Sequence, residues 1–322
     1  MKSGVSLPGP RRLDLVIDDS RDGRRVYDLL RRELGLSGTL LRRVKWLEDG
    51  ILLDGIRVTT RATVHAGQVL SVRLSDPERP AIPPVDGPLH LVYEDRDLVI
   101  VDKAAGVPSH PGPGHWSDSL GNYLTAHFAR TDPAAGFHPV HRLDRGTSGL
   151  MAVAKHPYAQ ERLKNQLHTG GFQRVYLAVC RGQPDPAEGT IDAPIGRCPD
   201  SILKRQVSAD GQRAVTHYRT LLTRADRSLL ALRLETGRTH QIRVHLAWLG
   251  HPLLGDFLYG EERPELITRP ALHSFQLSLL HPVTGARLSL IQPPPEDMLR
   301  LLPGQTAEKV LQIAKTCPLL PR

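Results

Sequence analysis

A proline-rich segment over residues 76–88 (DPERPAIPPVDGP) divides the 322-residue chain into two unequal parts. Proline lacks a backbone N–H and fixes φ, so such a run interrupts helices and strands. Segments of this composition commonly link domains. We therefore predict a small module over residues 13–75, the linker, a large domain over residues 89–300 and a C-terminal extension over residues 301–322.

The composition indicates a globular protein with a polyanionic partner. Hydrophobic residues make up 40% of the chain, the net charge is +8 and the isoelectric point is about 9.6. Such a charge favours nucleic acid as the partner, although many basic proteins bind none. The three cysteines form no CxxC pair and the 15 histidines show no zinc-type spacing. We therefore expect a reducing, cytoplasmic location and no metal.

Targeting and membrane segments are not expected. No apolar run reaches the roughly 20 residues of a membrane helix. The first twelve residues contain two prolines and lack the apolar centre of a signal peptide.

The small module is predicted to contain two helices, a hairpin and a further strand. Apolar residues at helical spacing predict one helix over residues 26–34 and a second that Ser37 caps. Asp54 and Gly55 lie between two apolar runs and predict a two-residue β-hairpin. Residues 69–74 predict another strand. Basic residues lie off the apolar faces of both helices: Arg31, Arg32, Arg42, Arg43 and Lys45.

The large domain is predicted to mix strands and helices, and periodicity alone is compatible with either α/β or α+β. Apolar runs and alternation predict strands over residues 89–95, 98–103, 150–154, 174–180 and 228–234. Helical spacing predicts helices over residues 120–128 and 158–169. A further helix is predicted to start at a Thr239 cap and to bury Ile242, Leu246 and Leu249. Arg243 lies beside that apolar stripe and can reach a cleft.

Charged residues gather just before the apolar run 150–154. The stretch from His138 to Leu150 contains a single carboxylate, Asp144, between Arg142 and Arg145. Neighbouring guanidinium groups favour the ionised form of a carboxylate, which can then act as a nucleophile or a base. A structural ion pair in a turn explains the same pattern, since ion-pair networks also cluster charges.

Two longer motifs carry a family resemblance over roughly residues 89 to 300. HRLDRGTSG, residues 141–149, resembles the HRLDxxTSG signature of the RluA-type pseudouridine synthases, and TGRTHQIRVH, residues 236–245, resembles their second motif. Residues 105–112 are similar to the KPxGxxxHP segment of that family. Tyr176 matches the tyrosine of its YxA motif. The resemblance implies an enzyme that isomerises uridine to pseudouridine in RNA.

The resemblance also implies the fold and the roles of individual residues. An α+β domain is implied, with a mixed, largely antiparallel central sheet crossed by an active-site cleft. Asp144 would be the catalytic carboxylate, Arg243 would pair with it and Tyr176 would stack on the target base. Arg142 would fill the place of the flipped nucleotide. Further substrate contacts are implied for His141, Arg145, Thr147, Arg238, His240 and Gln241. No cofactor is implied.

The order of elements in the small module is similar to that of the S4 RNA-binding domain, which implies that its basic helix faces bind RNA phosphates. A solvated basic surface gives the same pattern. Ribosomal RNA of the large subunit is the expected substrate, with transfer RNA as the alternative, and a monomer is expected. An RNA-binding protein with a silenced catalytic domain is disfavoured by the intact Asp144, Tyr176 and Arg243. A glycosidase is disfavoured because it normally needs two paired carboxylates.

Overall fold

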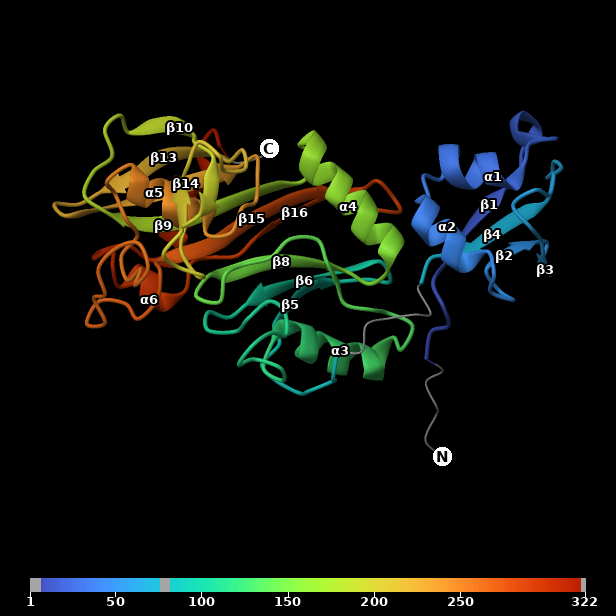
Figure 1. The fold of residues 1–322 in the computed structure, drawn as a ribbon, viewed down its shortest axis with the longest axis horizontal. Coiled ribbons are helices and arrows are strands. Elements are labelled where there is room, and N and C mark those ends of the chain that lie inside the picture. The colour runs from blue at the N-terminus through green and yellow to red at the C-terminus, as the bar shows by residue number, and fades with distance from the viewer. Residues whose placement is uncertain (1–6, 76–81, 320–322) are drawn as a thin grey trace.

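The computed structural model describes residues 7–75 and 82–319. A small N-terminal module lies to one side of a large domain, and helix α4 (Pro157–Thr169) lies between them (Figure 1). Part of the predicted linker 76–88 falls outside the described residues. Residues 82–88 form no helix or strand. They are attached to helix α3 (Leu120–Thr131), where the side-chain amide of Asn122 donates to the carbonyl of Pro83 at 2.9 Å.

The N-terminal module is a four-stranded antiparallel sheet packed against two helical segments. Its strands lie in the order β1-β4-β2-β3 and are β1 (Arg12–Val16), β2 (Ile51–Leu53), β3 (Ile56–Arg57) and β4 (Val69–Arg73). The first predicted helix runs from α1 (Val26–Asp28) directly into a π-helical turn (Leu29–Glu33). The second is α2 (Gly38–Val44), and the Ser37 hydroxyl caps it as predicted.

The predicted hairpin is confirmed by its backbone angles. Strands β2 and β3 pair on either side of Asp54 and Gly55, which have φ values of 50° and 82°. A type I′ turn requires positive φ at both central residues. Strand β1 was missed by the sequence analysis, although Leu13 and Leu15 alternate along it and contact the core of the module.

The N-terminal module is attached to the large domain through named contacts. Tyr158 of α4 is 5% exposed, packs in the apolar core of the module and donates its hydroxyl to the carbonyl of Leu34 at 2.8 Å. Arg11 binds both carboxylate oxygens of Asp97, at 2.7 and 3.1 Å. These contacts fix the module against α4 and the edge of the large domain.

The large domain is built on one ten-stranded sheet. Its main path runs β10-β13-β14-β9-β15-β8-β6-β5, with β16 paired to β15 and β7 paired to β8. Strand β15 (Leu272–Leu280) is parallel to β8 (Ser148–Ala154), and the other described pairs are antiparallel. The mixed, largely antiparallel sheet of an α+β fold is therefore confirmed. The remaining strands are β5 (Leu91–Glu94), β6 (Leu98–Lys103), β7 (His138–Pro139), β9 (Gln173–Arg181), β10 (Glu188–Asp192), β13 (Val215–Thr223), β14 (Arg227–Leu234) and β16 (Arg287–Ile291).

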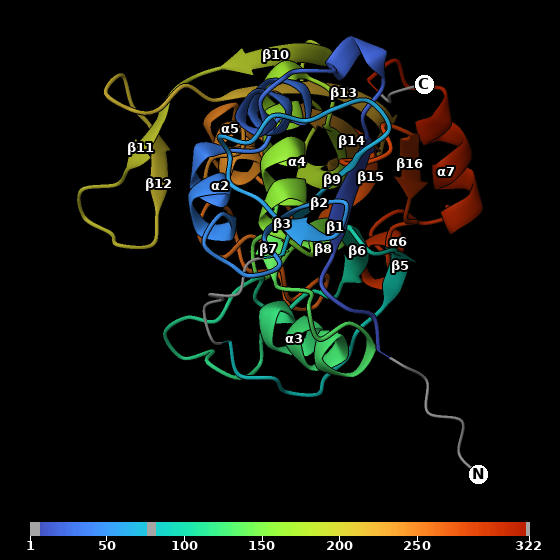
Figure 2. The same cartoon turned by 90° about the vertical axis from the view of Figure 1, so that its right-hand side faces the viewer.

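Helices cover both faces of this sheet (Figures 1 and 2). Leu124 of α3 packs in the same apolar cluster as Val101 of β6. Leu163 of α4 packs in a separate cluster with Ile100, the residue that precedes Val101 on β6. Because neighbouring strand residues point to opposite faces, α3 and α4 lie on opposite sides. Every residue of β8 is buried, as the unbroken apolar run predicts.

Helix α5 (Gln241–Trp248) begins one residue later than predicted, and the predicted Thr239 cap was wrong. Its N-cap is His240, which has a φ of 59° and makes no side-chain capping bond. The side-chain oxygen of Gln241 instead accepts the backbone N–H of Arg238 at 3.0 Å and so fixes the turn that precedes the helix. Ile242 and Leu246 are buried, as predicted.

The C-terminal residues 301–319 complete a core layer. Helix α6 (Glu296–Leu299) and helix α7 (Ala307–Lys315) follow the last strand. Leu301 and Val310 are buried in one apolar cluster with Val175 of β9. This segment therefore covers the sheet face opposite to α3.

Residues 182–213 contain β10 and a separate hairpin. That hairpin pairs β11 (Ile195–Arg197) with β12 (Arg205–Val207) and projects from the domain (Figure 2). Across the stretches 7–75 and 82–319, no helix has the length and apolarity needed to span a bilayer.

Candidate active site

A cleft of about 290 Å³ lies over the large sheet where two loops meet. One loop joins β7 to β8, the other joins β14 to α5, and Arg174 and Tyr176 of β9 lie between them. The two sequence motifs thus form opposite walls of one cleft. Most of the predicted site residues line it: His141, Arg142, Asp144, Thr147, Tyr176, Arg238, His240, Gln241 and Arg243.

Asp144 occupies a tight turn in the β7–β8 loop. Its carbonyl accepts the backbone N–H of Thr147 at 3.0 Å. Its side chain is 20% exposed, and Arg243 lies beside it, with Nη1 3.5 Å from Oδ2. One carboxylate oxygen is thus near a buried cation while the group remains accessible from the cleft.

Three buried side chains hold the backbone on both sides of Asp144. The Ser109 hydroxyl donates to the carbonyl of Leu143 at 2.7 Å. The Lys103 ammonium donates to the carbonyl of Arg145 at 3.3 Å and also to Ala104 and Val107. Arg269 donates from Nη1 to the carbonyl of Gly146 at 3.1 Å. Satisfied buried polar groups of this kind fix a loop in one geometry.

Arg243 has a stronger partner than Asp144. Its Nε and Nη2 each lie 2.7 Å from an oxygen of Asp256, a bidentate geometry that favours strong pairing. Arg243 is 4% exposed and Asp256 is fully buried. The guanidinium also lies over the rings of Phe257 and Tyr259, at 5.7 and 5.1 Å. The predicted pair with Asp144 is present, but Asp256 is the residue that positions Arg243.

Tyr176 lies on the cleft side of β9 and is 4% exposed. Burial raises the pKa of its hydroxyl, so the group stays protonated near neutral pH and can donate a hydrogen bond. The adjacent wall is formed by Leu234 and Leu272.

Some predicted substrate-binding residues are engaged inside the protein. Gln241 is 3% exposed, and its amide donates to the carbonyl of Val215 and to the hydroxyl of Thr216. His141 accepts the backbone N–H of Ala152 at 3.1 Å. Thr147 is also buried. These contacts give Gln241 and His141 a structural role in addition to any contact with substrate.

Other predicted residues are accessible. Arg142 is exposed at the cleft. Arg238 is exposed and donates to the carbonyl of Arg213 at 3.0 Å. His240 bonds to the Tyr259 hydroxyl at 2.9 Å, and burial lowers its pKa, so the ring is neutral at pH 7. Arg145 does not line the cleft and donates to the carbonyl of Gly106.

The basic residues of the N-terminal module lie on its helical segments. Arg32, Arg42 and Arg43 are exposed, whereas Arg31 and Lys45 are partly buried. Arg31 also donates to the carbonyl of Leu36. Beside α2 lies a further feature that the sequence analysis missed. Trp46 is 73% exposed, and the Lys45 ammonium is 4.8 Å from its ring centre.

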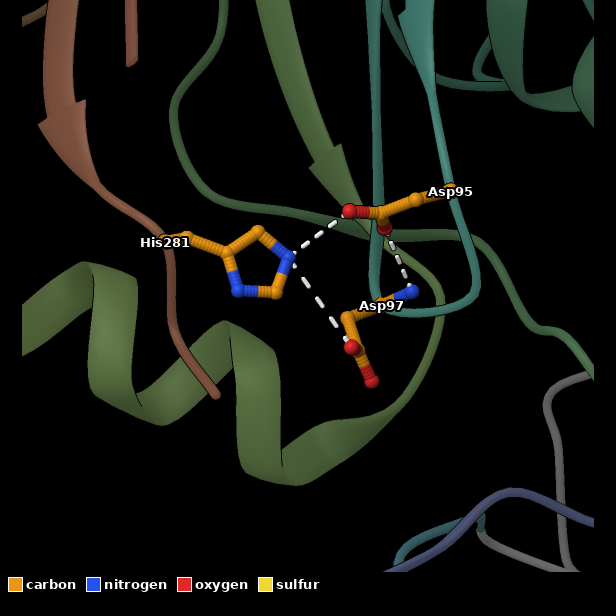
Figure 3. A group of neighbouring side chains, drawn as sticks. All are labelled: Asp95, Asp97 and His281. Carbon is orange, nitrogen blue, oxygen red and sulfur yellow. Dashed lines mark hydrogen bonds and ion pairs between the residues drawn. The ribbon is translucent and has the colours of Figure 1, made fainter. Parts of the chain in front are cut away.

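A cluster of metal-ligand type lies near α4, apart from the cleft. Figure 3 shows His281 between Asp95 and Asp97, with Nε2 at 2.7 and 3.8 Å from their oxygens. Arg11 binds both oxygens of Asp97, and His156 donates to one of them at 2.9 Å. Although burial opposes it, these bonds lower the pKa of Asp97. The guanidinium of Arg11 supplies the positive charge that a metal ion would supply. The cluster therefore attaches the N-terminal segment to the domain.

Comparisons with known proteins show which family the chain belongs to. The family model described as RNA pseudouridylate synthase matches residues 97–248. An uncharacterised RNA pseudouridine synthase of Bacillus subtilis, YjbO, is 44% identical over 85% of this chain and 96% of its own length. The ribosomal large subunit pseudouridine synthase D of Xanthomonas campestris is 40% identical over 89% and 90%.

Solved structures show the same fold. The structure of human RNA pseudouridylate synthase domain containing 1 is 26% identical, covers 75% of this chain and 98% of its own, and has a TM-score of 0.55. The family match and these relatives identify an enzyme that modifies RNA. The chain belongs to the RNA pseudouridine synthase family, of the RluA type, and is an isomerase.

Proposed function

We propose that this pseudouridine synthase modifies uridine in ribosomal RNA of the large subunit, with Asp144 as the catalytic carboxylate. The observation that carries the catalytic part is the position of Asp144. It is accessible in the cleft, next to the buried Arg243 and close to Tyr176. The name of the relative from Xanthomonas campestris supports the choice of RNA. The free cysteines support a cytoplasmic location.

The size of the cleft supports base flipping. A volume of about 290 Å³ is near the lower end of small-molecule pockets, so it accommodates a nucleoside and excludes a helix. An enzyme that acts on a base within a paired region must take it out of the stack. Arg142, which is exposed and lines the cleft, would occupy the vacated place in the RNA.

The isomerisation breaks the bond between the ribose anomeric carbon and N1 of uracil and forms a bond from the same carbon to C5. Asp144 either adds to the anomeric carbon or removes the 2′ proton while the base detaches. The uracil then rotates beside Tyr176, and C5 loses a proton after the new bond forms. The Tyr176 hydroxyl, which burial keeps protonated, can assist only as a hydrogen-bond donor or as a relay that passes its own proton on as it accepts the one from C5. N1 of uracil gains a proton as C5 loses one, so the atoms balance without any external group.

The N-terminal module would add affinity. Its exposed arginines Arg32, Arg42 and Arg43 can contact phosphates, which contribute binding energy without sequence information. This role agrees with the S4-like order of its helices and strands.

The experiment that tests the proposal is Asp144→Asn. The substitution keeps the shape and removes the charge, so it should abolish pseudouridine formation in RNA from cells that lack this protein. Binding of the same RNA should change little, because the phosphate contacts remain. Mapping pseudouridines in wild-type and deletion cells identifies the uridine. A purified Asn variant with turnover well above a no-enzyme control would refute the role of Asp144, and a missing pseudouridine in another RNA would refute the choice of substrate.

A further inference from the structure

Arg174 is a buried cation without a carboxylate partner. Its side chain lies on β9 and is 6% exposed, and within residues 7–75 and 82–319 no ion pair to it is found. Its one hydrogen bond runs from Nη2 to the carbonyl of Thr236 at 3.3 Å. Its Nε is buried and has no acceptor. The other arginines buried around the cleft, Arg243 and Arg269, each have a bidentate carboxylate.

His141 presents a second unused donor beside it. Its Nε2 accepts the N–H of Ala152, so the neutral ring carries its proton on Nδ1. That nitrogen is buried and has no partner. Burial and the charge of Arg174 lower the pKa of His141 to about 3, and the ring packs edge-on against Phe172 at 5.6 Å. The histidine is thus a fixed, neutral donor.

Both side chains belong to the wall of the cleft. Arg174 precedes Tyr176 by two residues on one strand, so the two side chains lie on the same face. The neighbouring loop leaves room for the guanidinium, because a Cβ atom at Gly237 would lie 3.0 Å from Nη1. Burying a charge or a donor without a partner costs free energy. A ligand that supplies the missing acceptor removes this cost.

We propose that Arg174 and His141 form a subsite for a backbone phosphate of the RNA, next to the flipped uridine. The subsite rests on the proposed function of the cleft. A phosphate fits better than a carbonyl of the base, because an anion neutralises the guanidinium and hydrogen bonds between charged groups are the stronger ones. Family motifs and the relatives' names do not assign this role to Arg174.

The test compares the binding of uridine, uridine 5′-monophosphate and uridine 3′-monophosphate to the full-length protein by calorimetry at low salt. The wild-type protein should bind one of the two nucleotides at least tenfold more tightly than uridine. Arg174→Met should abolish that preference, and Arg174→Lys should keep part of it. Arg233→Met is the matched control, because Arg233 lies opposite Val175 on the adjacent strand and so points to the other face of the sheet. It should keep the preference.

Thermal unfolding of the ligand-free protein gives a second readout that a structural arginine would not produce. Replacing an unpaired buried charge by an apolar side chain of similar size removes the cost of burying that charge. We therefore expect Arg174→Met to unfold at or above the wild-type temperature while it loses nucleotide preference. Arg174→Met would unfold at a clearly lower temperature if the residue were only part of the scaffold, and that result would overturn the proposal.

Two further outcomes would also overturn it. Equal weakening of uridine and nucleotide binding in Arg174→Met would show that the arginine contacts the base. Saturable binding of inorganic phosphate as tight as that of the nucleotide would indicate a general anion site. None of these measurements requires turnover, so a wild-type protein that forms no pseudouridine would refute the proposed function and leave the subsite to be judged by binding alone.

Discussion

Arg243 contacts two carboxylates, and their separate contributions can be measured. The pair with Asp256 is bidentate at 2.7 Å between fully or nearly fully buried groups. The contact with Asp144 is a single 3.5 Å distance to a carboxylate that is 20% exposed. The two contacts therefore differ in length, in geometry and in exposure to water, and these determine the energy of an ion pair.

Arg243→Met should cost roughly 3–5 kcal/mol of unfolding free energy, because it leaves the carboxylate of Asp256 buried without its cation. Asp256→Asn should also be costly, because Arg243 then keeps only the long contact to Asp144. Asp144→Asn should cost less than about 1 kcal/mol, since water already reaches this carboxylate. The effects on stability and on activity should therefore differ. Asp144, the residue proposed to act in catalysis, should contribute least to the free energy of unfolding.

Two double-mutant cycles, measured by urea unfolding, test this ranking. The coupling energy of Arg243→Met with Asp256→Asn should be about 2–3 kcal/mol, near the upper end for residues in contact. That of Arg243→Met with Asp144→Asn should be several-fold smaller. Arg243→Lys keeps the charge but lacks the planar fork, so it should recover only part of the loss. A coupling to Asp144 that equals or exceeds the coupling to Asp256 would refute the reasoning.

Three other predictions follow from the same geometry. Arg238→Met should raise the RNA concentration needed for half-maximal rate and lower the salt slope by about one phosphate contact, with little change in maximal rate; a fall in maximal rate alone would contradict it. Deletion of residues 1–80 should weaken RNA binding and flatten its salt dependence, and an unchanged slope would make the basic helices a solvated surface. Burial lowers the pKa of Lys103 to about 7, whereas the unfolded chain holds this proton to about pH 10. Unfolding free energy should therefore rise with pH between about 7 and 10 and level off below 7, where both states hold the proton, and Lys103→Met should abolish that rise in urea titrations.

Local rules predicted much of the framework. The helix α4, the buried strand β8 and the Asp54-Gly55 turn depend on short-range spacing and backbone preference, which a sequence displays directly. The Thr239 cap was wrong because the helix starts one residue later, with His240 in a left-handed conformation as its N-cap residue. Such a conformation gives no periodic signal in the sequence.

The site was predicted less completely than the fold. Asp144, Tyr176 and Arg243 were recognised from motifs, and the structure brings them to one cleft. The sequence analysis did not identify Asp256 as a partner of Arg243. A loop carboxylate thirteen positions away from its partner can be assigned to it only once the path of the loop is known. The burial of Arg174 could not be predicted from the sequence either, because an arginine on a strand is exposed or buried according to which elements cover it.

The buried cations around the cleft differ in their hydrogen-bond and ion-pair partners, and these partners indicate a different role for each. Arg243 and Arg269 are neutralised by Asp256 and Asp297, so they contribute rigid geometry and little net charge. Lys103 is surrounded by carbonyl groups and holds the turn of Asp144. Among these four, only Arg174 has a buried nitrogen that lacks an acceptor. A polyanionic substrate is the ligand that can complete such a site, and the free energy lost by leaving Arg174 unpaired is then recovered only when RNA binds.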